Sequence, residues 1–330
     1  MAQIFHDMKA WLHYGDPPEM QLASRAWRRK HTSLHAGPGH RLAMPVTKCE
    51  DGGMVTGILG IDAAWTETQP SGVVLLEWSP GGRPRFVAGA PSYGSFLELP
   101  EAGMVELAHA GFPGESPDAA ALLHACRRFR PDPGFEIGVV AVDMPIGPVP
   151  IGGRRDCDNG ISRRFGAMGC GTHSPSAKRP GPIGEKLFRE FEELGFAFAN
   201  TDTRPGDVPV IMEVYPHPAV LGLLNLRHRF PYKVSKSRRY WRGTTVRERI
   251  VRLLEQFEVL LTALRQEIDD IPLFLPAASE VRFLAELKKY EDLIDALICA
   301  WVGAAYLNEK AEPVGGRDGA IWIPTSVPER

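Results

Sequence analysis

The sequence predicts an α/β fold in which helices flank a mixed sheet. Three short apolar segments, 55–62, 73–78 and 86–90, are separated by turn sequences rich in Gly and Pro. This spacing favours consecutive antiparallel strands, because parallel neighbours need a long crossover. The segment 137–143 is apolar almost throughout, as is typical of a central parallel strand buried on both faces. Antiparallel and parallel strands in one chain indicate a mixed sheet.

Helices are expected between and after these strands. Ser116 and Pro117 form a helix start, with Ser at the N-cap and Pro in the first turn, and apolar residues follow one face as far as Phe129. The other expected elements are helices over 184–194, 218–226, 247–268 and 279–307, a strand over 208–214, and a short edge strand closed by Pro over 320–324.

Composition excludes several classes of protein. The chain has 330 residues, of which 44% are hydrophobic, so it can bury a sizeable core. Its net charge of -2 excludes a cationic field over the whole protein, so any nucleic-acid binding would depend on local patches. Five scattered cysteines without a Cys-x-x-Cys pair indicate neither a zinc ribbon nor a disulfide framework, and favour a cytoplasmic location. No apolar run is long enough to span a membrane.

The first 53 residues differ from the rest of the chain. No acidic residue lies between Glu19 and Glu50, whereas this stretch holds six Lys and Arg residues and is interrupted by Gly, Pro and His. We expect a basic, poorly ordered extension over 1–53 rather than a nucleic-acid-binding arm, followed by one domain over 54–330. Met54, directly before the first strand, is a possible natural start.

Residues 148–184 interrupt the periodic pattern and are expected to form a long inserted loop. Loops of this length more often carry function than ordinary connections do. Arg154 and Arg155 lie in it and could bind phosphate groups bidentately, or simply form a solvated face. Cys157 is expected to be inert, because no His or Asn partner can be assigned to activate its thiol.

Acidic residues at strand ends and on an apolar helix form the candidate site. Asp62 and Asp143 end strands, Glu213 lies within one, and Asp292 and Asp295 share one face of a helix at i, i+3 spacing. Like charges at this spacing repel, so a hard divalent cation, Mg²⁺ or Mn²⁺, is the simplest compensation. Each acid alone could instead be a turn cap or an ion-pair partner, and only their convergence would make a site.

Basic and aromatic residues could contact a substrate. Lys233 and Lys236 lie among Tyr and Trp residues, a composition that suits contact with a phosphate backbone and stacking of bases, although aromatic residues also pack. His217, between two prolines, is either a proton shuttle or phosphate contact, or a structural histidine of the turn.

Six short motifs in this order carry a resemblance. They are Gly60-Ile61-Asp62, VDMPIG at 142–147, Arg155-Asp156-Cys157-Asp158, EVYPHP at 213–218, Tyr232-Lys233 and Asp295-Ala296-Leu297. The set resembles the DUF429 family of predicted nucleases with a ribonuclease H-like fold. The Asp-x-x-Asp spacing of Asp292 and Asp295 is similar to the closing motif of RuvC-type Holliday-junction resolvases.

The resemblance implies a ribonuclease H-like sheet and a metal-dependent nuclease acting on nucleic acid by a two-metal mechanism. The catalytic residues would be Asp62, Asp143, Glu213 and Asp295. The ligands of Mg²⁺ or Mn²⁺ would be Asp62, Asp143, Asp292 and Asp295. The substrate contacts would be Arg154, Arg155, His217, Lys233 and Lys236.

Two alternatives stay open at this point. Residues 60–66 faintly resemble the first phosphate loop of nucleotide-dependent kinases with the actin/hexokinase-like fold, although a second phosphate loop is not found. A non-catalytic nucleic-acid-binding module would keep the fold without the chemistry. Loss of cleavage on Asp62→Asn would favour the nuclease, whereas binding that is indifferent to a chelator and to Asp143→Asn would favour the module.

Overall fold

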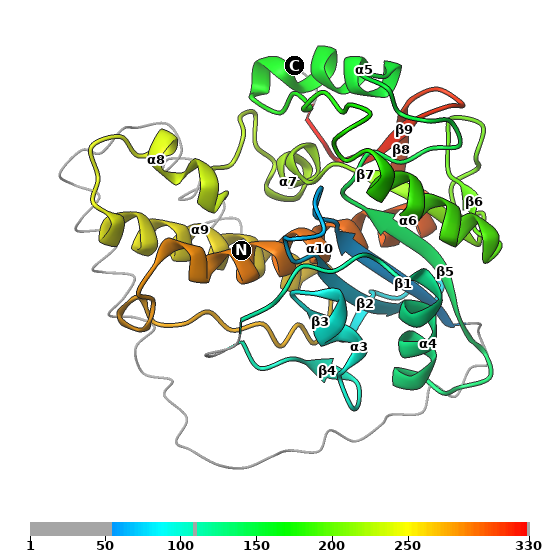
Figure 1. Ribbon diagram of the computed structural model, residues 1–330, viewed down its shortest axis with the longest axis horizontal. Coiled ribbons are helices and arrows are strands. Elements are labelled where there is room, and N and C mark those ends of the chain that lie inside the picture. Colours follow the sequence, from blue (N-terminus) through cyan, green and yellow to red (C-terminus); the bar gives the residue numbers. More distant parts are fainter. Residues whose placement is uncertain (1–54, 108–110, 329–330) are drawn as a thin grey trace. The chain divides into compact units, whose positions relative to one another are not determined.

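The computed structural model describes residues 55–107 and 111–328. Within them, strands form one mixed sheet in the order β4-β3-β2-β1-β5-β7-β9-β8, with β6 beside β7 (Figure 1). The expected extension over 1–53 lies outside the described residues. In the described part of the chain, no helix has the length and apolar character that crossing a bilayer requires.

The sheet combines an antiparallel half with a parallel half, as expected. β1 pairs antiparallel with β2, and β2 with β3. On its other side β1 pairs parallel with β5, followed by β7 and β9, and β8 closes the sheet antiparallel to β9. The strands are β1 Val55–Asp62, β2 Gly72–Trp78, β3 Arg85–Ala90, β4 Gly103–Met104, β5 Phe135–Val142, β6 Ala197–Phe198, β7 Val210–Val214, β8 Ala311–Gly315 and β9 Ala320–Pro324.

Helices cover both faces of this sheet (Figure 1). One face packs against α3, α4 and α6 in a cluster of buried aliphatic and aromatic side chains. The other face packs against α10, which lies over β1, β2 and β5 and is itself contacted by α9. The helices are α3 Tyr93–Leu97, α4 Ala119–Phe129, α5 Asp156–Phe165, α6 Pro182–Glu193, α7 Pro216–Leu224, α8 Ser237–Tyr240, α9 Val246–Glu267 and α10 Lys288–Leu307.

Glycines in β1 and β2 let the backbone of α10 approach the sheet closely. A Cβ atom on Gly60 would lie 2.3 Å from the carbonyl oxygen of Ala296, and one on Gly72 would lie 2.3 Å from that of Asp292. Both distances are far shorter than a van der Waals contact. Glycine is therefore required at both positions, and the contact fixes the first half of α10 beside the ends of β1 and β2.

The C-terminal strand differs from the prediction of an edge strand over 320–324. β9 lies between β7 and β8, and all five of its residues are buried. The edge is β8, which the sequence pattern did not reveal. β8 contains Pro313, which has no N–H to donate to a further strand and is therefore tolerated at an edge.

The sequence predicted a continuous loop over 148–184, but the structure does not show one. The segment contains α5, and α6 begins at its end. The start of α5 is fixed by Asp158, whose carboxylate accepts a hydrogen bond from the backbone N–H of Arg155 at 2.9 Å. The helix is short and mostly polar, so few apolar residues mark it in the sequence, whereas its N-terminus is well capped.

We predict that Gly60→Ala destabilises the protein. The added methyl group meets the backbone of α10, which cannot move aside as a side chain can, so the free energy of unfolding should fall by about 1–3 kcal/mol. The matched control is Gly134→Ala, where a Cβ atom meets nothing within 4 Å. Urea denaturation of both variants measures the difference, and equal stabilities would contradict the close-packing argument.

Candidate functional site

Asp62 and Asp143 lie side by side at the carboxyl ends of β1 and β5. The residues before them, Ile61 and Val142, pair in the parallel ladder, and the N–H of Asp143 donates to the carbonyl oxygen of Ile61 at 2.8 Å. Because side chains alternate along a strand, Asp62 shares the α10 face with Gly60. Both carboxylates are half-buried, and neither has a hydrogen-bond or ion-pair partner within residues 55–107 and 111–328.

Asp295 on α10 is fully buried and is neutralised by a lysine. Its carboxylate accepts a hydrogen bond from the hydroxyl of Tyr232 at 2.7 Å and contacts the Lys233 ammonium. The same ammonium lies 3.7 Å from Glu291, whose carboxylate also accepts a hydrogen bond from the N–H of Val234 at 2.5 Å. α10 therefore holds the segment 232–234 through a buried, charge-compensated cluster.

Asp292 is also buried, and it has a lysine of its own. The Lys288 ammonium contacts its Oδ1 atom from one helical turn away and lies 3.1 Å from Glu291. The second oxygen, Oδ2, is buried and has no hydrogen-bond partner. The repulsion expected between Asp292 and Asp295 is thus relieved by two lysines.

Burial and neighbouring charges set the protonation of the site. Burial raises the pKa of Asp143 well above its usual range, and the charges of Asp62 and Asp295 raise it further, whereas Lys233 lowers it. Burial likewise raises the pKa of Asp295 to about 6, against the lowering effect of Lys233. Burial alone would lower the pKa of Lys233, but Asp295 and other negative neighbours outweigh it and raise that pKa well above its usual value. Lys233 therefore stays protonated.

The expected four-carboxylate, two-metal centre does not fit these residues. In the described ranges, no three His, Cys, Asp or Glu side chains come close enough together to hold a metal ion. Asp292 and Asp295 already have lysine partners. Asp62 and Asp143, with uncommitted oxygens, do fit a single Mg²⁺ or Mn²⁺, because Mg²⁺ is often held by one or two carboxylates, waters and substrate phosphates.

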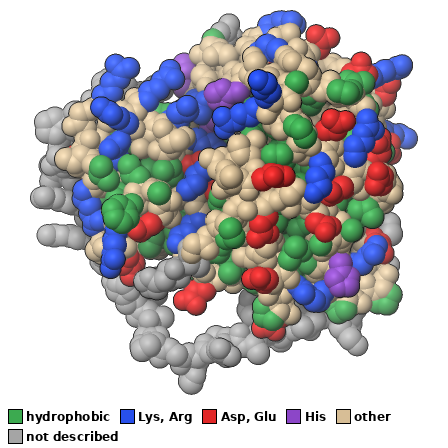
Figure 2. Space-filling view, in the orientation of Figure 1, with side chains coloured by type: hydrophobic (Ala, Val, Ile, Leu, Met, Phe, Trp, Pro, Cys, Tyr) green, Lys and Arg blue, Asp and Glu red, His purple; other side chains and the backbone are tan. Residues whose placement is uncertain are grey.

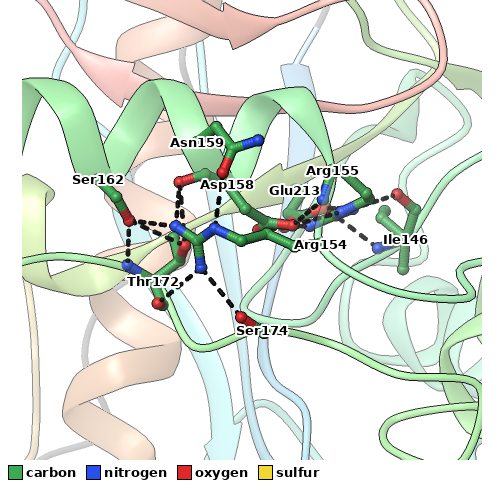
Figure 3. A network of polar contacts seen from close by, with 9 residues as sticks. All are labelled: Ile146, Arg154, Arg155, Asp158, Asn159, Ser162, Thr172, Ser174 and Glu213. Carbon is green, nitrogen blue, oxygen red and sulfur yellow. Dashed lines mark hydrogen bonds and ion pairs between the residues drawn. The ribbon is translucent and has the colours of Figure 1, made fainter.

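Glu213 lies on the opposite face of the sheet from this carboxylate pair. It is level with Val142 in the β5–β7 ladder, and Ile211, two residues before it, packs in the core under α4 and α6. Its carboxylate receives two hydrogen bonds from the Arg155 guanidinium, both at 2.7 Å (Figure 3). Arg155 also binds the buried Asp158. Glu213 and Arg155 thus form a structural ion pair, not the catalytic acid and phosphate contact that we expected.

Arg154 binds its own loop instead of presenting a free guanidinium (Figure 3). Its three nitrogens donate to Asn159, Ser162 and Ser174 and to the carbonyl oxygens of Asp158 and Thr172. These bonds tie the start of α5 to residues 172–174. The expected phosphate contact at this position is therefore replaced by a structural one.

His217 is buried in the first turn of α7, beside the carboxylate site. Its ring packs edge-on against Tyr215 and Tyr232, and its Nε2 atom contacts the guanidinium of Arg229. Burial lowers the pKa of His217 well below its usual value, and the charges of Lys233 and Arg229 lower it further, so the ring is neutral. Lys236, by contrast, is exposed.

Cys157 is inert, as expected. It is fully buried in α5, and burial raises the pKa of its thiol to about 12, so it stays protonated and a poor nucleophile. The four cysteines in the described ranges are free thiols.

Sequence reasoning missed several residues of the site. Lys288 is the exception, because its position four residues before Asp292 on the same helical face is visible in the sequence. Glu291 carried no signal beyond its charge. Arg229 follows α7 in a segment without periodicity, and only the fold brings it to His217.

A family model described as "Protein of unknown function (DUF429)" matches residues 60–319. The matched stretch contains every residue of the site described above. No curated protein and no solved structure matches the chain.

We predict that Glu213→Gln destabilises the protein by about 3–5 kcal/mol, because it leaves the largely buried Arg155 without its full counter-charge. The side chain of Glu213 is only 5% exposed and that of Arg155 is 12% exposed. The control, Glu136→Gln, breaks an exposed pair with Arg127 and should cost less than about 1 kcal/mol. Chemical denaturation measures both, and similar losses for the two variants would contradict the structural role of Glu213.

Proposed function

This chain belongs to the DUF429 family, and we propose that it hydrolyses phosphodiester bonds of nucleic acid with the help of Mg²⁺ or Mn²⁺ at Asp62 and Asp143. One observation carries the proposal. Two half-buried carboxylates lie together at the ends of parallel strands without a partner among the described residues, next to a lysine that stays protonated. Such a pair repels itself and favours a cation.

The strand arrangement supports the proposal. Three antiparallel strands, β3, β2 and β1, are followed in the sheet by the parallel strands β5 and β7. This is the order expected for a ribonuclease H-like sheet, with the first acid at the end of the central strand. A helix late in the chain, α10, carries Asp295 and packs on the face of the sheet that Gly60 shares with Asp62.

The metal ion, when bound, would supply charge stabilisation at the phosphoryl oxygens and a water of lowered pKa. Asp62 and Asp143 would hold it at the carboxyl ends of β1 and β5, where both side chains are partly exposed. Because the two acids come from adjacent paired strands, their separation is set by the β1–β5 ladder and not by flexible loops. The scissile phosphate is thereby fixed relative to the sheet.

Lys233 takes the place that a second metal ion holds in the two-metal prediction. Its ammonium contacts Asp295 and acts electrostatically on Asp143 and Asp62. Its side chain is 16% exposed, so it reaches solvent while its orientation is fixed by the buried carboxylate. An ammonium held in this way binds a non-bridging phosphate oxygen and stabilises the charge that develops on it.

The same lysines also favour one alternative, a nucleic-acid-binding module without chemistry. Asp292 and Asp295 are compensated without any metal, so the fold can keep its acids while binding phosphate through Lys233 alone. The two functions are distinguished by removing the metal or the Asp143 carboxylate. A nuclease would then lose hydrolysis, whereas a binding module would keep its nucleic-acid binding.

We predict that Asp62→Asn and Asp143→Asn each lower phosphodiester hydrolysis on the order of 10²-fold or more, since each removes a ligand of the ion that stabilises the transition state. The assay uses single- and double-stranded DNA, RNA and branched DNA, with Mg²⁺, with Mn²⁺ and with a chelator. The control, Glu101→Gln, alters an exposed acid two residues before the edge strand β4. Hydrolysis that survives Asp143→Asn overturns the proposal, and metal-independent binding without cleavage identifies the binding module.

We predict that Lys233→Met destabilises the protein by about 3–5 kcal/mol, because Asp295 and Glu291 lose their shared cation. Adding Asp295→Asn removes the uncompensated charge and should restore most of the lost stability, but not the hydrolysis. Lys310→Met, at an exposed lysine, is the control. Wild-type hydrolysis by the double variant would show that Lys233 has only a structural role.

A further inference from the structure

Arg229 lies beside the proposed site and has no acidic partner among the described residues. Its guanidinium contacts the Nε2 atom of His217 and donates weakly to the carbonyl oxygen of Gly169 at 3.4 Å. Its Nε–H is buried and has no acceptor. A buried donor of a charged group is costly when it is unpaired, so this arrangement is suited to an anion.

His217 offers a second unpaired donor at the same place. It is only 6% exposed, and its Nδ1 atom is buried without a partner. Because a guanidinium can only donate, the Nε2 atom that contacts Arg229 must be the acceptor. In a neutral imidazole the other nitrogen then carries the hydrogen, so Nδ1–H is a donor that lacks an acceptor.

Tyr240 adds a third polar group to this cluster. Its hydroxyl is buried and lies within side-chain hydrogen-bonding reach of Arg229, although the geometry falls short of a regular hydrogen bond. It lies close enough to Arg229 and Lys233 for both charges to act on it and lower its pKa, against the larger effect of burial, which raises it. His217 and Tyr240, from separate segments, thus place polar atoms beside the Arg229 guanidinium.

The surroundings of this cluster are basic. His173 is exposed, and partial burial lowers its pKa, as do the nearby charges of Lys236, Arg229 and Arg179. Figure 2 shows Lys, Arg and His side chains gathered around a hollow in the upper part of the view, beside α8. An anion entering here meets positive charge at the rim before it meets the buried donors.

The cluster is continuous with the carboxylate site. Tyr215 is acted on by both Arg229, which lowers its pKa, and Asp143, which raises it, although burial has the largest effect and raises it. Lys233 acts on both His217 and Asp143. Tyr215 is therefore near both Arg229 and Asp143, and Lys233 is near both His217 and Asp143.

We propose that Arg229, His217 and Tyr240 form a second phosphate subsite, with Lys236 and His173 at its rim, which binds a phosphate of the substrate other than the scissile one. The inference rests on the proposed function and names its substrate class: a strand that carries a further phosphate close to the bond that is cut. That phosphate is either an internal diester or a terminal monoester. Polar groups on three side chains suit an anion with several acceptor oxygens, as both forms of phosphate have.

Phosphate binding by the full chain without divalent metal tests the subsite apart from the chemistry. The probe is inorganic phosphate at constant ionic strength, measured by calorimetry and by the shift in melting temperature. We expect wild type and Asp143→Asn to bind it, and Arg229→Met to bind it at least about tenfold more weakly, because a charge-assisted contact is lost. Arg163→Met, at an exposed arginine, is the control. Equal binding by Arg229→Met and wild type overturns the inference, whether or not hydrolysis is found.

Oligonucleotides distinguish the two sources of the phosphate. Strands with a 5′-phosphate, a 3′-phosphate or only hydroxyl ends are compared in binding to wild type, Arg229→Met and Tyr240→Phe. A preference for one phosphorylated end that Arg229→Met abolishes identifies a monoester, whereas equal weakening for all strands identifies an internal diester. Tyr240→Phe, which removes only a hydroxyl, keeps the test valid if Arg229→Met fails to fold. If Tyr240→Phe and a folded Arg229→Met both bind every strand as tightly as wild type does, the inference is overturned.

Discussion

The close packing of α10 against β1 and β2 is the constraint on which the site depends. Gly60 and Gly72 leave no room for side chains, so the helix backbone lies directly on the two strands. The acids in the first half of α10 are therefore carried into the interior, where Asp292 and Asp295 are 1% and 0% exposed. The geometry that brings them to the strand ends also removes them from water.

Buried carboxylates need compensation, and the chain supplies it with lysines. Lys288 comes from the same helix and Lys233 from the segment between α7 and α8. Once these pairs form, Asp292 and Asp295 are no longer available as simple metal ligands. Asp62 and Asp143 stay uncommitted at the open end of the sheet, which concentrates the proposed chemistry on two carboxylates and one fixed ammonium.

Charge pairing also separates the structural arginines from Arg229, the arginine of the proposed phosphate subsite. Arg155 forms ion pairs with Glu213 and Asp158, and Arg154 donates its hydrogen bonds to the loop around it (Figure 3). Arg229 contacts a histidine ring, a backbone oxygen and the Tyr240 hydroxyl, and it has no acidic partner in the described ranges. The pair of arginines that most resembled a phosphate clamp is thus structural, whereas Arg229, which no sequence motif indicated, lies beside His217 and Tyr240.

The sequence by itself determined the α/β class, most strands and helices, and the position of Asp62 and Asp143 at strand ends, because hydrophobic periodicity and turn residues are local properties. It could not determine which acids are free. Lys233 pairs with Asp295 across 62 positions, and Arg155 with Glu213 across 58. Only the tertiary structure decided these pairs and the face on which Glu213 lies, because both follow from strand register and helix packing, which bring distant side chains together and leave no periodic trace in the chain.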